Sequence, residues 1–249
     1  MGLRTYIVNV GFIGERGTSD WVLVDTGLRF SEDHIVGYAE ENFTGPPLAI
    51  LLTHGHFDHV GSIQKLLELW KVPVFAHEAE LPYLTGKADY PPADPSVGGG
   101  LMALISPAYP HSGIDIGDKV QALPSDGSLP YLKEWKWLST PGHTPGHVSF
   151  YREKDGTLLA GDAFISVKQE SMLDVISQKK TIHGPPTYFT PNWEHARESV
   201  KKLEALNPNY ALTGHGQPME GKDLQDGLHY LVSHFDQVAI PDHGRYVSE

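Results

Sequence analysis

The sequence contains no cysteine, which excludes disulfide bonds, thiolate metal ligands and a cysteine nucleophile. It also lacks any apolar run close to the roughly 20 residues that a transmembrane helix needs. The first residues show no basic segment followed by a sustained apolar one, the pattern typical of a signal peptide. We therefore expect a cytoplasmic protein without a membrane-spanning helix.

Basic residues are scarce as well. The chain has 19 lysines and arginines against 31 aspartates and glutamates, a formal net charge of −12, and no basic run. This balance argues against a nucleic-acid-binding surface, so we expect a small-molecule substrate and neither nucleic acid nor membrane as a partner. With 249 residues, 40% of them hydrophobic, the chain is long enough to bury a substantial core.

Histidine, in contrast, is abundant, with 14 residues, and three of them lie in the stretch 53–59. This stretch follows an apolar run, 48–52, that predicts a buried strand, and it precedes a helical pattern over 61–70. Residues two apart in extended chain point the same way, so His54 and His56 should converge on one ion. Asp58 and His59 fall at the start of the helix and could reach a second ion. Imidazole and carboxylate without thiolate suit zinc, iron or manganese.

Three later strands end in a similar way. Predicted strands over 135–138, 158–160 and 210–212 lead into His143, Asp162 and His215, each beside a glycine. In layered α/β folds the loops at strand ends carry the chemistry. If these ends share one edge with the histidine loop, seven candidate ligands come together.

Other segments carry weaker signals. A strand is predicted over 3–12 and another over 21–25, and Thr190 is expected to cap a helix that has Pro191 at its first position. The pattern fails over 82–130, where repeated proline and glycine predict an irregular insertion, with a short helix at 101–105. We interpret this insertion as either a lid over the site or a subunit contact in a homo-oligomer. His147 is expected to be structural, because His143 already serves its turn.

These motifs, in their order along the chain, resemble those of the metallo-β-lactamase superfamily, and especially its glyoxalase-II-like branch. The matching residues are the Asp25 turn, His54-x-His56-x-Asp58-His59, Gly142-His143-x-x-Gly146-His147, Gly161-Asp162 and Gly214-His215-Gly216. The resemblance implies one α/β domain over 1–249 with an αββα four-layer sandwich and two metal ions at one edge.

The resemblance also implies a ligand assignment. One metal would take His54, His56 and His143, the other would take Asp58, His59 and His215, and Asp162 would bridge the two. Asp25 would help to hold the histidine loop by hydrogen bonding without being a ligand.

The function we expect is hydrolysis of an ester, thioester or lactone of a small molecule by a binuclear metal-dependent enzyme, most simply with zinc. Two ions about 3.5–4 Å apart can share a water and lower its pKa towards ~7, so that a bridging hydroxide attacks the carbonyl. Asp58 and Asp162 would orient it and relay its proton.

Three other functions stay open. The first is a sulfur (persulfide) dioxygenase with one iron on His54, His143 and Asp162, and the second is β-lactam hydrolysis as a side activity. The third is a metal-bearing scaffold without catalysis. The complete second ligand set favours the hydrolase, and the sequence does not identify the substrate.

Overall fold

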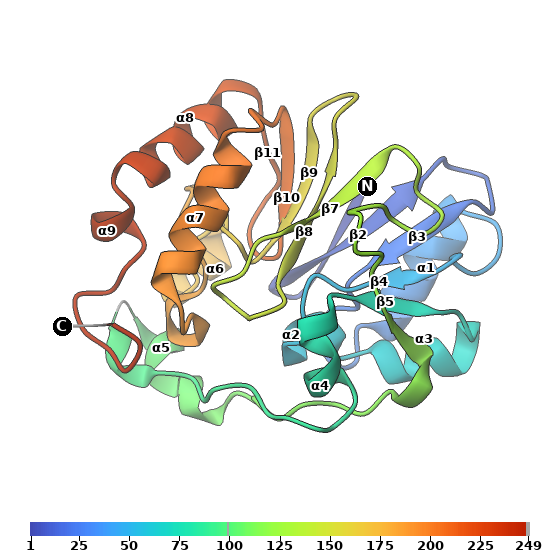
Figure 1. The fold of residues 1–249 in the computed structure, drawn as a ribbon, viewed down its shortest axis with the longest axis horizontal. Coiled ribbons are helices and arrows are strands. Elements are labelled where there is room, and N and C mark those ends of the chain that lie inside the picture. The colour runs from blue at the N-terminus through green and yellow to red at the C-terminus, as the bar shows by residue number, and fades with distance from the viewer. Residues whose placement is uncertain (99, 248–249) are drawn as a thin grey trace. The chain divides into compact units, whose positions relative to one another are not determined.

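The computed structural model describes residues 1–98 and 100–247; Gly99, inside the predicted insertion, lies outside the described residues. The chain divides into two compact units (Figure 1). The first unit comprises residues 1–90 and 112–136, and the second comprises residues 91–111 and 137–249. The candidate ligands are divided between the two units, so each unit is described by itself.

The first unit is built on a six-stranded mixed sheet with the order β1-β2-β3-β4-β5-β6. Its first three strands pair antiparallel and the others pair parallel. The strands are β1 (Gly2–Thr5), β2 (Val8–Gly14), β3 (Trp21–Val24), β4 (Ile50–Leu51), β5 (Val74–Ala76) and β6 (Val120–Ala122). The parallel strands β3 and β4 both end towards the candidate site, at the Asp25 turn and the histidine loop respectively.

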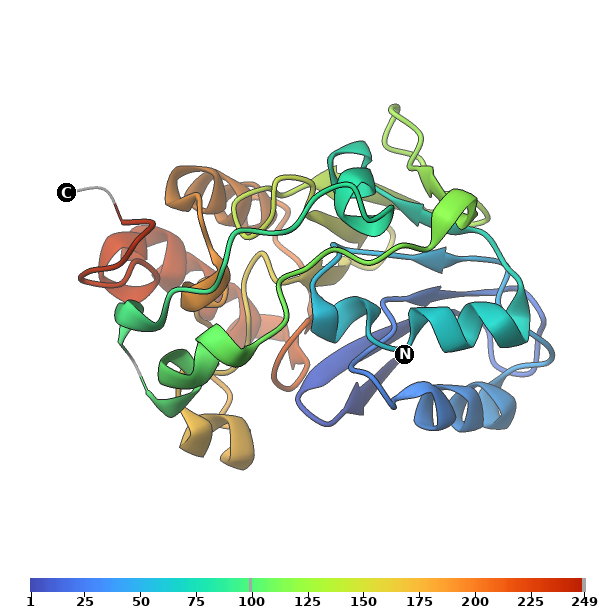
Figure 2. The ribbon, with the colours of Figure 1, turned by 90° about the horizontal axis from the view of Figure 1, so that it is seen from below.

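Helices α1 (Glu32–Asn42) and α3 (Ile63–Trp70) lie side by side on this sheet (Figure 2). Both carry apolar residues at helical spacing, and these pack on the sheet with Phe12 and Trp21 in one buried cluster. Trp21 also stacks on Phe43, with ring centroids 4.6 Å apart. Burial of each such side chain contributes about 1.5–3 kcal/mol, which makes the sheet a rigid base for the loops at its strand ends.

Short helical segments complete the first unit. They are α2 (Phe57–Val60), which carries part of the histidine motif, η1 (Glu78–Glu80), α4 (Leu81–Leu84) and η4 (Gly117–Lys119). The Ser62 hydroxyl at the start of α3 donates to the carbonyl of Leu28 at 2.7 Å. This bond ties the segment after the histidine motif to the segment after Asp25.

The second unit contains a five-stranded mixed sheet with the order β11-β10-β9-β8-β7. Its strands are β7 (Trp135–Ser139, beginning at the unit boundary), β8 (Val148–Arg152), β9 (Thr157–Gly161), β10 (Tyr210–Thr213) and β11 (Met219–Glu220). Helices α7 (Trp193–Glu204) and α8 (Gly221–Ser233) pack on it with one buried apolar face each (Figure 1). The remaining helices are η2 (Pro95–Val97), α5 (Leu101–Ile105), η3 (Ser106–Ala108), α6 (Met172–Ser177), η5 (Thr187–Phe189) and α9 (Phe235–Val238).

The structure corrects three sequence predictions. Residues 3–12 form a hairpin instead of one strand, with Thr5 paired to Val8 and Tyr6 at a φ of 59° in the turn. The insertion at 82–130 contains the predicted helix α5 but also strand β6, which pairs with β5. Helix α7 is capped by the Asn192 side chain, which accepts from the N–H of His195 at 2.9 Å, and not by Thr190.

Across residues 1–98 and 100–247, no helix combines the length and the apolar composition needed to cross a bilayer.

Candidate metal centre

In the first unit, Asp25 organises the histidine loop. Its Oδ1 accepts from the backbone N–H of Thr53 at 2.8 Å, and its Oδ2 accepts from the Thr53 hydroxyl and from Nδ1 of His59, both at 2.8 Å. All of these groups are buried. Asp25 has a φ of 60°, which directs the chain sharply away from β3. Its carboxylate therefore holds the two ends of the loop together, the role that the resemblance implied.

The three histidine rings of this loop lie close together. The ring centroid of His54 is 4.8 Å from that of His56 and 4.2 Å from that of His59, and all three side chains are buried. Asp58, on α2, is half-buried. The first unit thus brings together the four candidate ligands of the 53–59 motif.

Hydrogen bonding fixes the tautomers of two of these histidines. Thr53 gives its hydroxyl proton to Asp25, so its oxygen accepts from Nδ1–H of His54 at 3.0 Å. The Nδ1–H of His59 donates to the Asp25 carboxylate. In both rings the lone pair is then on Nε2, the atom that can bind a metal.

Two residues of the first unit that the sequence did not predict also contact this loop. The backbone N–H of Gly55 donates to Oε2 of Glu80 and to Oη of Tyr90, both at 3.0 Å. Burial and the neighbouring Glu80 carboxylate raise the pKa of Tyr90 well above its ordinary value, so the phenol keeps its proton and donates it to Glu80. No local pattern in the sequence links positions 55, 80 and 90.

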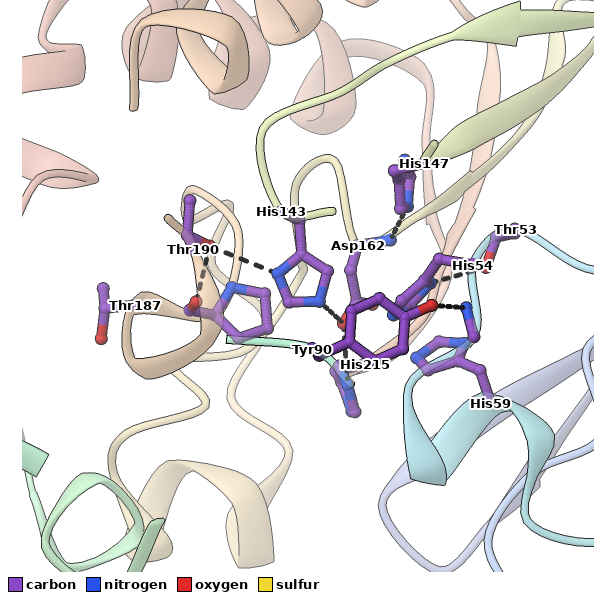
Figure 3. Close-up of polar contacts among 12 residues, drawn as sticks. Thr53, His54, His59, Tyr90, His143, His147, Asp162, Thr187, Thr190 and His215 are labelled. Carbon is purple, nitrogen blue, oxygen red and sulfur yellow. Dashed lines mark hydrogen bonds and ion pairs between the residues drawn. The ribbon is translucent and has the colours of Figure 1, made fainter. Parts of the chain in front are cut away.

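In the second unit, three strand ends deliver His143, Asp162 and His215 to one place (Figure 3). The Nε2 of His143 lies 3.6 Å from Oδ2 of Asp162, and the Nε2 of His215 lies 3.2 Å from the same oxygen. All three side chains are at least 97% buried. Two imidazole nitrogens therefore converge on one carboxylate oxygen, an arrangement suited to cations shared by the three groups.

His147 fixes the backbone of Asp162 by a hydrogen bond. Its Nδ1 lies 3.1 Å from the carbonyl oxygen of Thr140. Its Nε2 accepts from the backbone N–H of Asp162 at 2.9 Å, as Figure 3 shows. Both ring nitrogens are thus used in contacts with the chain, and the ring is fully buried. His147 is structural, as expected.

Thr190, predicted to cap a helix, contacts His143 instead. It donates its hydroxyl proton to the carbonyl of Pro186 at 2.7 Å and lies 3.3 Å from Nδ1 of His143, from which it can only accept (Figure 3). His143 therefore also carries its lone pair on Nε2. The helix begins two residues later than predicted because this hydroxyl is engaged elsewhere.

The donor set fits a divalent metal. Metal-binding histidines characteristically donate their second ring N–H to an oxygen of the protein, which fixes the ring orientation and raises the basicity of the ligand nitrogen. His54, His59 and His143 all show this pattern, with Thr53, Asp25 and Thr190 as the acceptors. Buried imidazoles with carboxylates, and no thiolate, suit zinc, iron or manganese.

Comparison with known proteins agrees with these features. A family model described as "Metallo-beta-lactamase superfamily" matches residues 3–215. "Probable metallo-hydrolase YflN" of Bacillus subtilis is 51% identical over 240 residues, which cover 95% of this chain and 91% of that protein.

Solved structures show the same likeness. The protein TTHA1623 in a di-iron-bound form is 25% identical, with a TM-score of 0.57 over 88% of this chain and 93% of that one. BLEG-1, a B3 metallo-β-lactamase, is 24% identical, with a TM-score of 0.64 over 93% of this chain and 99% of that one. These likenesses confirm the fold class that the motifs predicted.

Proposed function

Because the chain belongs to the metallo-β-lactamase superfamily, we propose that it is a metal-dependent hydrolase that uses two divalent ions to cleave a small ester, thioester or lactone. Its 51%-identical relative, a probable metallo-hydrolase, supports the reaction class. The di-iron-bound form of TTHA1623, which shares this fold, supports two ions. Zinc is the metal we propose, with iron and manganese as alternatives.

The proposed site combines the ligands of both units. The first ion would be bound by His54, His56 and His143. The second would be bound by Asp58, His59 and His215. Asp162 would contribute its carboxylate to both. The assembly of the two ligand sets rests on the family relationship, because each unit by itself supplies only part of the site.

The observation that carries this proposal is the position of Asp162. His143 and His215, assigned to different ions, direct their Nε2 atoms at the same Oδ2 from 3.6 Å and 3.2 Å. A carboxylate that serves a single ion would need only one of them nearby. The convergence favours a bridging carboxylate.

The chain's own residues would position and move protons around the substrate. When bound, the ions would polarise the scissile carbonyl and lower the pKa of water towards ~7. Asp58 is half-buried, so its carboxylate can both contact a bound group and exchange a proton with solvent. Asp162, held through its own backbone by His147, would keep a fixed position during the reaction.

The Asp25–His59 contact favours two ions over the mononuclear iron dioxygenase. The dioxygenase would use His54, His143 and Asp162, and it would have no need for an oriented His59. Here the His59 ring is fully buried and fixed by Asp25 at 2.8 Å. A buried imidazole with a set tautomer is what a second metal site requires.

For the substrate we propose an apolar acyl chain or ring. In the second unit, Tyr109 packs against Tyr188 and Phe189, with ring centroids 5.8 Å and 6.3 Å away. The next residue after Phe189 is Thr190, which contacts His143. Tyr109 therefore packs on the two residues that precede Thr190, and nearby helix α5 carries the exposed apolar residues Leu101, Leu104 and Ile105. These could cover an apolar substrate.

A hydrolase screen on metal-reconstituted protein tests the proposal. The panel should contain esters, thioesters, lactones and a β-lactam, with Asp162→Ala as the control. We expect hydrolysis of at least one carbonyl class that is lost on chelation and in Asp162→Ala. Oxygen uptake with glutathione persulfide, and no hydrolysis, would replace the hydrolase with the dioxygenase.

A further inference from the structure

The backbone between two proposed ligands is held by a buried acid–phenol pair. Gly55, which separates His54 from His56, donates its N–H to Oε2 of Glu80 and to Oη of Tyr90, both at 3.0 Å. Glu80 is fully buried and Tyr90 is 3% exposed. The phenol also donates to the same carboxylate oxygen. Glu80 Oε2 therefore receives two hydrogen bonds, and Tyr90 Oη both gives and receives one.

This pair is costly to bury and therefore sensitive to geometry. A carboxylate away from water is stable only when its hydrogen bonds are well made, and a missing partner costs about 1–3 kcal/mol or more. Because all three polar groups depend on one another, a shift of the Gly55 backbone would break two contacts together. The pair thus restrains the loop more tightly than one hydrogen bond would.

Tyr90 also holds one of the ligand rings directly. Its ring lies 4.5 Å from that of His56 at an interplanar angle of 68°, a favourable edge-to-face contact. Tyr83 stacks on Tyr90 at 4.0 Å and 14°. The His56 ring therefore packs against an aromatic side chain that is itself fixed by stacking and by Glu80.

The residue type at position 55 matches this arrangement. Gly55 is not among the glycines with positive φ, so its conformation does not require glycine. A Cβ there would lie 2.5 Å from Oη of Tyr90 and 3.0 Å from Cδ2 of Leu84. Glycine is needed because the phenol approaches the backbone closely.

We propose that Glu80 and Tyr90 are positioning residues that set the directions of His54 and His56 towards the metal. They act on the backbone between the two ligands and on the ring of the second. The inference rests on the proposed metal site and goes beyond it, since neither residue belongs to the ligand motifs. The alternative is that Glu80 and Tyr90 only attach residues 78–90 to the sheet, in which case substituting them would not change metal binding.

Three substitutions separate these roles. Tyr90→Phe keeps the ring and removes the hydroxyl, and Glu80→Gln keeps the shape and removes the charge. Tyr83→Phe is the matched control, because it removes the hydroxyl of a half-buried residue in the same stack, whereas the Gly55 N–H donates to Glu80 and Tyr90. Metal affinity is measured by chelator competition, and ligand geometry by the visible absorption of cobalt(II)-substituted protein.

We expect Tyr90→Phe and Glu80→Gln to weaken the retention of one ion by about 10–100-fold, the usual effect of removing a group that orients a ligand. Their cobalt spectra should differ from the wild-type spectrum, and Tyr83→Phe should match the wild type in both measurements. If either of the two variants folds and binds metal with wild-type affinity and spectrum, the inference is wrong. If the wild type binds no metal, the proposed function fails and this inference fails with it.

Discussion

The backbone N–H of Asp162 donates to Nε2 of His147 at 2.9 Å, while Nδ1 of the same ring lies 3.1 Å from the carbonyl oxygen of Thr140. One buried imidazole thus links the end of β7 to the residue proposed to bridge two ions. The second histidine of the Gly-His-x-x-Gly-His motif therefore supports the site by fixing the chain rather than by binding metal.

The first prediction concerns this link. His147→Ala should lower the free energy of unfolding by about 1–3 kcal/mol or more, because the Asp162 N–H and the Thr140 carbonyl lose their buried partner. Urea unfolding of the metal-free protein measures it. His195→Ala, at an exposed position on α7, is the control and should change stability little. Equal stabilities of the two variants would contradict the prediction.

The second prediction concerns Asp25. Asp25→Asn keeps the shape but offers one acceptor oxygen where the loop presents three donors, from Thr53 and His59. We expect Asp25→Asn to weaken metal affinity by about 10–100-fold. We expect Asp162→Ala to lose more activity than Asp25→Asn does. Asp20→Asn, at an exposed position before β3, should behave as wild type. Small and equal effects of Asp25→Asn and Asp162→Ala would oppose these assignments.

The third prediction concerns substrate choice. Replacing Leu101, Leu104 and Ile105 with serine should leave the fold and the metal content unchanged, because these side chains are exposed. Catalytic efficiency should fall on substrates with long acyl chains and persist on a small activated ester. Leu69→Ser, at an exposed position on α3, is the control. An unchanged substrate profile would exclude the lid, and a change from oligomer to monomer with full activity would indicate a subunit contact.

Tyr90 and Asp94, both in the insertion, make contacts that the substrate-choice experiment must leave intact. The whole insertion cannot be removed to test the lid, because Tyr90 packs on the histidine loop and Asp94 accepts from the N–H of Ser96 and from that of Arg245. Substitutions on α5 avoid both anchors.

The fourth prediction concerns pH. Burial lowers the pKa of His183, reinforced by Lys168 and opposed by Glu170. As the pH falls below about 6.5, His183 is therefore protonated in the unfolded chain before it is protonated in the folded chain. The free energy of unfolding falls with pH over this range, until the pH passes below the lowered pKa of the folded state. His183→Gln should lose less stability than wild type between pH 7.5 and 5.5 in urea unfolding of metal-free protein. His195→Gln, at an exposed site, should follow the wild type; the same slope in His183→Gln would refute the prediction.

Much of the site was predictable because its signals are local. His54 and His56 alternate in extended chain. The Asp162 and His215 motifs follow strands β9 and β10 directly, and the His143 motif begins shortly after β7. Family motifs in the right order then indicated the fold, which the comparisons confirm. Membership of the glyoxalase-II-like branch, the single domain over 1–249 and the full ligand set remain predictions.

Other parts were not predictable because the chain gives no local sign of them. The turn at Tyr6 contains no glycine, asparagine or proline, and its position is set by pairing of β1 with β2. Glu80 and Tyr90 meet Gly55 only through the fold, across 25 and 35 positions of sequence. Thr190 has the sequence of a helix cap, but a tertiary contact with His143 takes its hydroxyl.

The central claim is that the chain binds two ions with Asp162 between them. Elemental analysis of protein purified without chelator, and again after reconstitution, tests it most directly. We predict close to two ions per chain in the wild type and a reduced content in Asp162→Ala. One tightly bound iron per chain, with no second ion after reconstitution and the same content in the variant, would contradict the claim.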